Sequence, residues 1–119
     1  MADYKGIIVA EGLHDPTVIN KFAVYKAEIT ANGMPIDYDG HFGRWHTYYV
    51  TCSKKEIDEL QPQIIRGWYA HFWEGNKIFV IYNDKQFEMF RDNKSTWKVA
   101  IEHGREQGIP ENELDFPTD

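Results

Sequence analysis

Three stretches of strongly β-forming residues constrain the fold of this chain most: 44–52, 67–73 and 77–82. Their branched and aromatic side chains suit the pleated surface of a sheet. Successive residues of a strand point to opposite faces, and each stretch places large apolar or aromatic groups on both. We therefore expect a sheet that needs cover on both faces, whereas two short helices can cover only one.

The remaining strands are expected at 6–10, 23–30 and 85–90, where short apolar or alternating runs are bounded by turn residues. The last of these follows a tight hairpin at Asn83-Asp84. A long loop, 31–43, separates the second strand from the third. Hairpins and short connections of this kind favour antiparallel neighbours.

Two helices are marked by their end signals. Ser53 and Glu56 have the spacing of a capping box, and Pro62 should kink or end the helix that follows. A second helix is expected from about residue 95 to Gly108, where a left-handed glycine and the nearby Pro110 stop it.

These elements predict a single α+β domain over residues 1–119. We expect an antiparallel sheet of five to six strands with two main helices on one face, a ferredoxin-like arrangement being one option. Leu114 and Phe116, in the C-terminal segment (residues 111–119), should dock back onto the domain.

Charge and composition narrow the partners. The net charge is −6 and the thirteen Lys and Arg residues are scattered, which disfavours nucleic acid and anionic membranes as partners. The single cysteine, Cys52, rules out an internal disulfide. The start of the chain lacks the layout of a signal peptide, and no apolar run approaches the length of a membrane span. We therefore expect a cytoplasmic protein.

Several strings of residues resemble a family of small uncharacterised bacterial and archaeal proteins. They are Lys5-Gly6-Ile7-Ile8, Trp45-His46-Thr47, Trp68-Tyr69-Ala70-x-Phe72, Phe79-Val80-Ile81-Tyr82 with Lys85-x-Phe87, and His103-Gly104-x3-Gly108-Ile109-Pro110-x3-Leu114-Asp115-Phe116. The family pattern suggests Tyr at position 103 and Asp at position 71, where this chain has His. The resemblance covers most of the chain and implies one domain, without an activity.

The aromatic surface of the sheet is the main candidate site. Aromatic residues make up 15% of the chain, and monomers rarely leave contiguous apolar patches of more than a few hundred Å² exposed. A sheet face without helical cover would therefore contact a second copy of the chain, a protein partner or a small flat ligand, unless the 31–43 loop and the C-terminal segment cover it. The candidate binding residues are Trp45, His46, Tyr48, Tyr69, His71 and Trp73.

The leading hypothesis is a binding or interaction module, with a homodimer as one option. The alternative is a small enzyme for a polar metabolite, in which His46 and His71 share a face with Tyr48 and Tyr69 and perform acid–base chemistry. The competing interpretation is a pair of half-buried histidines bonded to neighbouring hydroxyls. A single-stranded nucleic-acid binder is a third, weaker hypothesis because it needs a basic rim.

Other candidate residues have simpler explanations. Asp37, Asp39, His41 and His46 are spaced like metal ligands, but loops are naturally rich in Asp and His, so we favour a solvated turn and predict no metal and no cofactor. Glu11, at the end of a strand, could act as a base if buried, although such residues more often face water.

Cys52 precedes a capped helix, whose N-terminus could acidify its thiol. His46 lies six residues back along the strand, roughly 20 Å away, too far to act as its base. We therefore expect Cys52 to be a small buried apolar residue.

Overall fold

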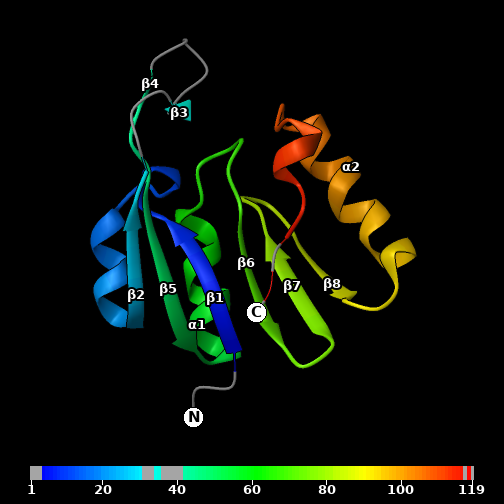
Figure 1. Ribbon diagram of the computed structural model, residues 1–119, viewed down its shortest axis with the longest axis horizontal. Coiled ribbons are helices and arrows are strands. Elements are labelled where there is room, and N and C mark those ends of the chain that lie inside the picture. The colour runs from blue at the N-terminus through cyan, green and yellow to red at the C-terminus, as the bar shows by residue number, and fades with distance from the viewer. Residues whose placement is uncertain (1–3, 31–33, 36–41, 117, 119) are drawn as a thin grey trace.

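The computed structural model of this protein describes residues 4–30, 34–35, 42–116 and 118. Six strands form one sheet in the order β2-β5-β1-β6-β7-β8, and all neighbours are antiparallel (Figure 1). Their bounds are β1 (Tyr4–Val9), β2 (Ala23–Ile29), β5 (His46–Cys52), β6 (Ala70–Glu74), β7 (Lys77–Ile81) and β8 (Gln86–Phe90). Two short strands, β3 (Met34–Pro35) and β4 (Phe42–Gly43), pair with each other. The predicted α+β fold with an antiparallel sheet is confirmed.

The described residues also form two α-helices and five 3₁₀ helices. They are α1 (Lys54–Leu60), α2 (Lys98–Glu106), η1 (Ala10–Gly12), η2 (Pro16–Lys21), η3 (Gln61–Gln63), η4 (Lys94–Trp97) and η5 (Glu111–Glu113). Both halves of the predicted capping box form at the start of α1. After α2, Gly108 adopts the expected left-handed conformation with φ 88°. Among the residues that the structure describes, no helix is long and apolar enough to cross a membrane.

The two main helices pack on opposite faces of the sheet, so the prediction that they share one face is wrong. On one side, which we call the α1 face, Ile57 and Leu60 of α1 share a buried cluster with Ile8 and Phe72 of the sheet. On the other, the α2 face, Ala100 of α2 belongs to a separate cluster with the sheet residues of opposite alternation. These are Trp73, Ile78, Val80 and Met89. Because the central strands β1, β5, β6 and β7 carry apolar side chains on both faces, each face takes its own helix.

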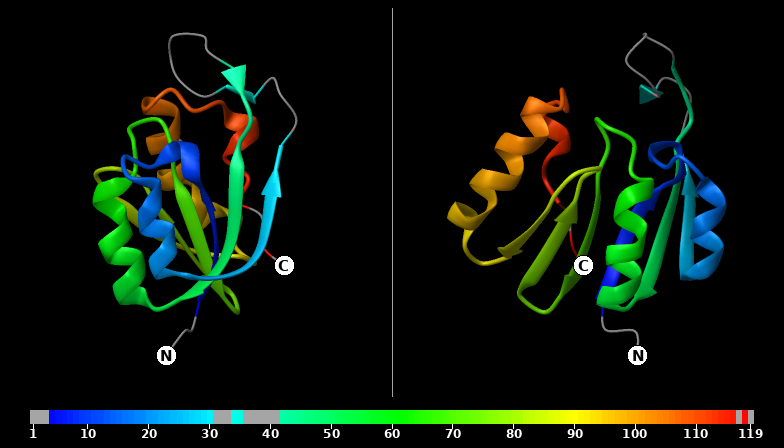
Figure 2. Two further views of the ribbon diagram at one scale, coloured as in Figure 1. Left: turned by 90° about the vertical axis from the view of Figure 1, so that its left-hand side faces the viewer. Right: turned by 180° about the vertical axis from the view of Figure 1, so that it is seen from behind.

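The C-terminal segment completes the cover over β6, β7 and β8. Leu114 and Phe116 are buried in the same cluster as α2, as predicted. A Cβ on Gly104 of α2 would lie only 2.6 Å from Leu114 Cδ2, so the glycine permits the segment to approach the helix closely. Figure 2 (left) shows α1 and the C-terminal segment on opposite sides of the sheet.

The other half of the α2 face has no comparable cover. The faces of β1 and β5 on this side carry Ile7 and Tyr49, both partly exposed. Edge strand β2 is exposed along its whole length. Among the described residues, no helix packs on the α2 face of these three strands. On the α2 face, the C-terminal segment therefore covers one half of the sheet and leaves the other half open. The candidate site lies at the boundary between the two halves.

Candidate functional site

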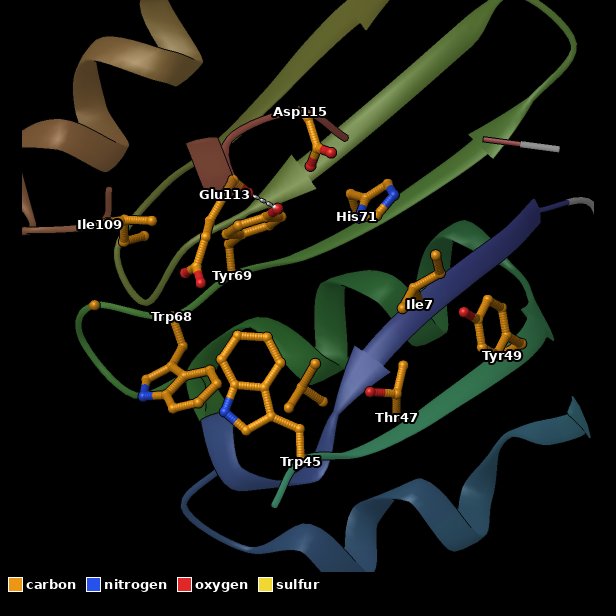
Figure 3. A pocket seen from close by; sticks show the side chains of 12 residues that line it. Ile7, Trp45, Thr47, Tyr49, Trp68, Tyr69, His71, Ile109, Glu113 and Asp115 are labelled. Carbon is orange, nitrogen blue, oxygen red and sulfur yellow. Dashed lines mark hydrogen bonds between the residues drawn. The ribbon is translucent and has the colours of Figure 1, made fainter. Parts of the chain in front are cut away.

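A pocket of about 320 Å³ lies on the α2 face between the C-terminal segment and strands β1 and β5 (Figure 3). Ile7 pairs with Tyr49 of β5 on one side and with His71 of β6 on the other, so these three side chains share a face. The full lining is Ile7, Val9, Trp45, Thr47, Tyr49, Gly67, Trp68, Tyr69, His71, Ile109, Glu113 and Asp115. Strand register thus brings together residues that are far apart in the sequence.

Two tryptophans form an aromatic wall at one end of the pocket. The rings of Trp45 and Trp68 lie with centroids 5.3 Å apart and planes tilted by 60°. Trp68 follows Gly67, which has φ 92° and donates its N–H to Gln107 Oε1 at 3.1 Å. A Cβ on Gly12 would lie 2.9 Å from the Trp68 ring, so the ring packs directly on the η1 backbone. The backbone of η1 therefore supports the Trp68 ring of this wall.

The covered side of the pocket is built from Tyr69 and His71. The Tyr69 hydroxyl donates a hydrogen bond to the Glu113 carbonyl, which ties the C-terminal segment to the sheet. Burial raises the pKa of Tyr69, and the nearby charge of Asp115 raises it further. His71 is only 4% exposed, and its ring stacks on Trp73 at 5.5 Å. Tyr69 is therefore a neutral, hydrogen-bonded group at physiological pH.

Two carboxylates of the C-terminal segment give the pocket its charge. Glu113 is half-buried, and burial followed by the charge of Asp115 raises the pKa of its carboxyl. Within the described ranges, neither carboxylate forms a hydrogen bond or an ion pair with another side chain. The described lining residues include no Lys or Arg. The pocket is thus apolar and aromatic with a negative rim.

The structure separates the six predicted binding residues into three groups. Trp45, Tyr69 and His71 line the pocket. Trp73 is on the same face but buried in the core under α2. His46 and Tyr48 lie on the α1 face, because Tyr48 pairs with Ile8 and alternates with the pocket residues of β5.

The expected convergence of His46 and His71 is therefore wrong. Strand β1 inserts between β5 and β6, and its register places Tyr49, not Tyr48, in line with His71. A shift of one residue in register moves a side chain to the other face of the sheet. The sequence contains the strands but not this register, so the two histidines could not be assigned to their faces.

Sequence reasoning missed five of the polar and aromatic groups around the pocket. They are Thr47, Tyr49, Trp68, Glu113 and Asp115. The first three belong to the alternate faces of strands that were already predicted to be two-sided, so that alternation was an available signal. Glu113 and Asp115 flank Leu114, whose docking was expected, but nothing in the sequence shows what the flanking side chains face.

Glu11 forms a contact outside the pocket. It accepts hydrogen bonds from the His46 backbone N–H and pairs with His46 Nδ1, each at 2.7 Å. This arrangement ties η1 to the start of β5. In the α1 core, Cys52 is buried, and burial followed by the charge of Glu56 raises the pKa of its thiol to about 12. A thiol with this pKa is a small packing residue and not a nucleophile at neutral pH.

Most of the residues that are spaced like metal ligands in the sequence have no described position. Asp37, Asp39 and His41 lie outside the described residues. Among the residues that the structure does describe, no group of three or more His, Cys, Asp or Glu side chains is arranged to hold a metal ion.

Comparison with models of known protein families, with curated proteins and with solved structures finds no match for this chain. The pocket and the residues that line it are therefore the features that indicate a function.

Proposed function

We propose that this protein is a binding module whose contact site is the pocket between the C-terminal segment and strands β1 and β5. The observation that carries the proposal is the pocket itself, with its aromatic wall, apolar floor and few convergent polar groups. Its volume of about 320 Å³ lies at the lower end of the range of small-molecule sites, which runs from roughly 300 to 1,000 Å³.

Binding is better supported than catalysis by the arrangement of the titratable groups. General acid–base work needs side chains within hydrogen-bond reach of one substrate. His46 and His71 lie on different faces of the sheet, so they cannot act together. The Tyr69 hydroxyl is already bonded to the Glu113 carbonyl, and the raised pKa of Tyr69 keeps the group protonated.

A second copy of the chain is the main competing occupant. Strand β2 is an edge strand, and its side chains Val24, Tyr25 and Ile29 are exposed. Exposed edges of this kind can pair with another chain. The proposal includes a cytoplasmic location, where a chain whose only cysteine is a buried thiol keeps it reduced.

The proposal is tested by a fragment screen against ¹⁵N-labelled protein, with the tryptophan indole N–H signals as reporters. Compounds that enter the pocket should shift the signals of Trp45 and Trp68. The signal of Trp97 should stay unchanged, because its indole is buried in the core cluster of the α2 face and donates to the Phe90 carbonyl at 2.8 Å.

A pair of matched variants supplies the control. Thr47→Phe fills the pocket floor, whereas Thr51→Phe places the same ring on the same face of β5, outside the pocket. We expect Thr47→Phe to abolish the shifts and Thr51→Phe to keep them. Hits that survive Thr47→Phe, or an absence of hits together with a dimer in sedimentation velocity, would overturn the pocket as the contact site.

A further inference from the structure

Two carboxylates, those of Glu113 and Asp115, lie at the rim of the pocket. Figure 3 shows the Glu113 carboxylate extending toward Trp68 and the Asp115 carboxylate directed toward the His71 side. The described residues that line the pocket include no Lys or Arg. Burial and the charge of Asp115 together raise the pKa of Glu113, as expected for two like charges beside an apolar surface. A ligand that brings positive charge would relieve this repulsion.

The body of the pocket suits a flat and apolar partner. Its floor is made by Ile7 and Val9, and its end wall by the rings of Trp45 and Trp68. Aromatic rings stack on one another and attract cations to their faces, an effect that is strongest for Trp. The aromatic wall and Glu113 line the same pocket, so one ligand can contact both.

We infer that the ligand of this pocket is a small aromatic cation, with a planar amidinium or guanidinium group attached to a flat ring. This inference rests on the proposed binding function and adds the charge and shape of the ligand. The ring would lie on the floor against Trp45 and Trp68, and the N–H groups would donate to Glu113. A planar pair of N–H donors matches a carboxylate in two parallel hydrogen bonds. Asp115 would add a second negative charge nearby.

Anionic ligands fit this site poorly. A phosphate, a nucleotide or a carboxylic acid would bring a third negative charge beside Glu113 and Asp115, and like charges repel one another. The net charge of −6 acts in the same direction at long range. A neutral flat ligand keeps the stacking but leaves the repulsion between the two carboxylates in place.

The experiment compares three probes of the same shape and different charge: 2-naphthamidine, 2-naphthamide and 2-naphthoate. Their affinities for the full chain are measured by isothermal titration calorimetry at neutral pH, and indole N–H shifts of Trp45 and Trp68 locate the bound probe. We expect the amidine to bind at least about tenfold more tightly than the amide, and the naphthoate to bind most weakly, because charge-assisted hydrogen bonds are stronger than neutral ones.

Two double variants separate the local charge from the overall charge. Glu113→Gln with Asp115→Asn should reduce the preference for the amidine to less than about threefold while the amide binds as before. Glu102→Gln with Glu106→Gln removes the same two charges from the exposed side of α2 and should leave the preference intact.

The ligand class is wrong if the amide or the naphthoate equals the amidine, if the preference survives in Glu113→Gln/Asp115→Asn, or if none of the three probes binds. Each of these results leaves the binding function itself to be judged by the fragment screen and the Thr47→Phe variant. A screen whose hits are all neutral or acidic and are blocked by Thr47→Phe would keep the pocket and overturn the cation.

Discussion

The two halves of the α2 face share a pattern but differ in their environment. Over β6, β7 and β8, α2 and the C-terminal segment bury the face, and Trp73 is only 4% exposed. Over β1, β5 and β2 the same face is open, and Tyr25 is 52% exposed. Both halves carry aromatic side chains on alternating positions. Whether an aromatic residue belongs to the core or to a binding surface is therefore decided by what packs on it.

The cover depends on particular close contacts. The Tyr82 hydroxyl donates to the Ala100 carbonyl at 2.7 Å and joins the sheet to α2. Phe116, 1% exposed, packs its ring against Tyr69 at a centroid distance of 5.2 Å. Tyr69 packs against the core cluster and also lines the pocket. The pocket therefore lies directly beside the covered half of the face.

The largest expected difference between the halves is the cost of removing one indole from each. Trp97→Ala deletes a buried ring from the cover and should lower the free energy of unfolding by about 3–5 kcal/mol. Trp45→Ala deletes a half-buried ring from the pocket wall and should cost about 1 kcal/mol, the order of one aromatic pair. Urea unfolding followed by circular dichroism measures both. Equal losses would mean that the open half is as tightly packed as the covered half.

A smaller effect separates two tyrosines on the same face. Tyr69→Phe removes the hydrogen bond to the Glu113 carbonyl and should cost about 1 kcal/mol of unfolding free energy, because that bond is partly buried. Tyr49→Phe removes a hydrogen bond to Glu28, an exposed residue, and should change stability by less than about 0.5 kcal/mol. The urea midpoints of the two variants decide the comparison, and a larger loss for Tyr49→Phe would contradict it.

The smallest expected effects depend on pH and differ in sign. The pKa of Glu113 is raised by burial and by Asp115, so its ionisation opposes folding. The stability that protonated Glu113 contributes is fully present below its unfolded pKa, and it is lost as the pH rises through the folded pKa. Glu113→Gln should therefore raise the melting temperature at pH 7, and this gain should vanish below about pH 4, where the carboxyl is protonated in both states.

Asp84, on the covered side, is the control, because its pKa is shifted in the opposite direction to that of Glu113. Its hydrogen bond to His103 Nε2, 2.8 Å long, holds the pKa of Asp84 below its usual value. Its ionised form therefore contributes stability above the unfolded pKa, and this contribution is lost as the pH falls through the folded pKa. Asp84→Asn should lower the melting temperature at pH 7 and lose this effect in acid. Melting curves from pH 3 to pH 7 that move in the same direction for both variants would contradict the assignment.

Local signals in the sequence predicted most of the elements. The capping box at Ser53, the left-handed Gly108 and the hairpin at Asn83-Asp84 depend on neighbouring residues only, and the structure contains all three. The strand expected at 67–73 begins later, at Ala70, because Gly67 adopts a positive φ and Trp68 lies in a loop against η1. Local propensity could not anticipate that contact.

The candidate site was predictable only in part. Trp45, Tyr69 and His71 were selected because they are aromatic or titratable residues on two-sided strands, and all three line the pocket. His46 was selected on the same grounds and lies on the other face, bonded to Glu11. The chemistry of a side chain can be read from the sequence, whereas its face depends on the strand that pairs with it.

By itself, the sequence determined that this chain forms an antiparallel sheet with apolar side chains on both faces, because alternation and turn signals act over a few residues. Only the tertiary structure decided that β1 lies between β5 and β6, that α1 and α2 take opposite faces, and that the C-terminal segment packs beside Tyr69. Strand order and helix placement arise from long-range packing among residues distant in the chain. The pocket, with Glu113 and Asp115 at its rim, is a product of that packing.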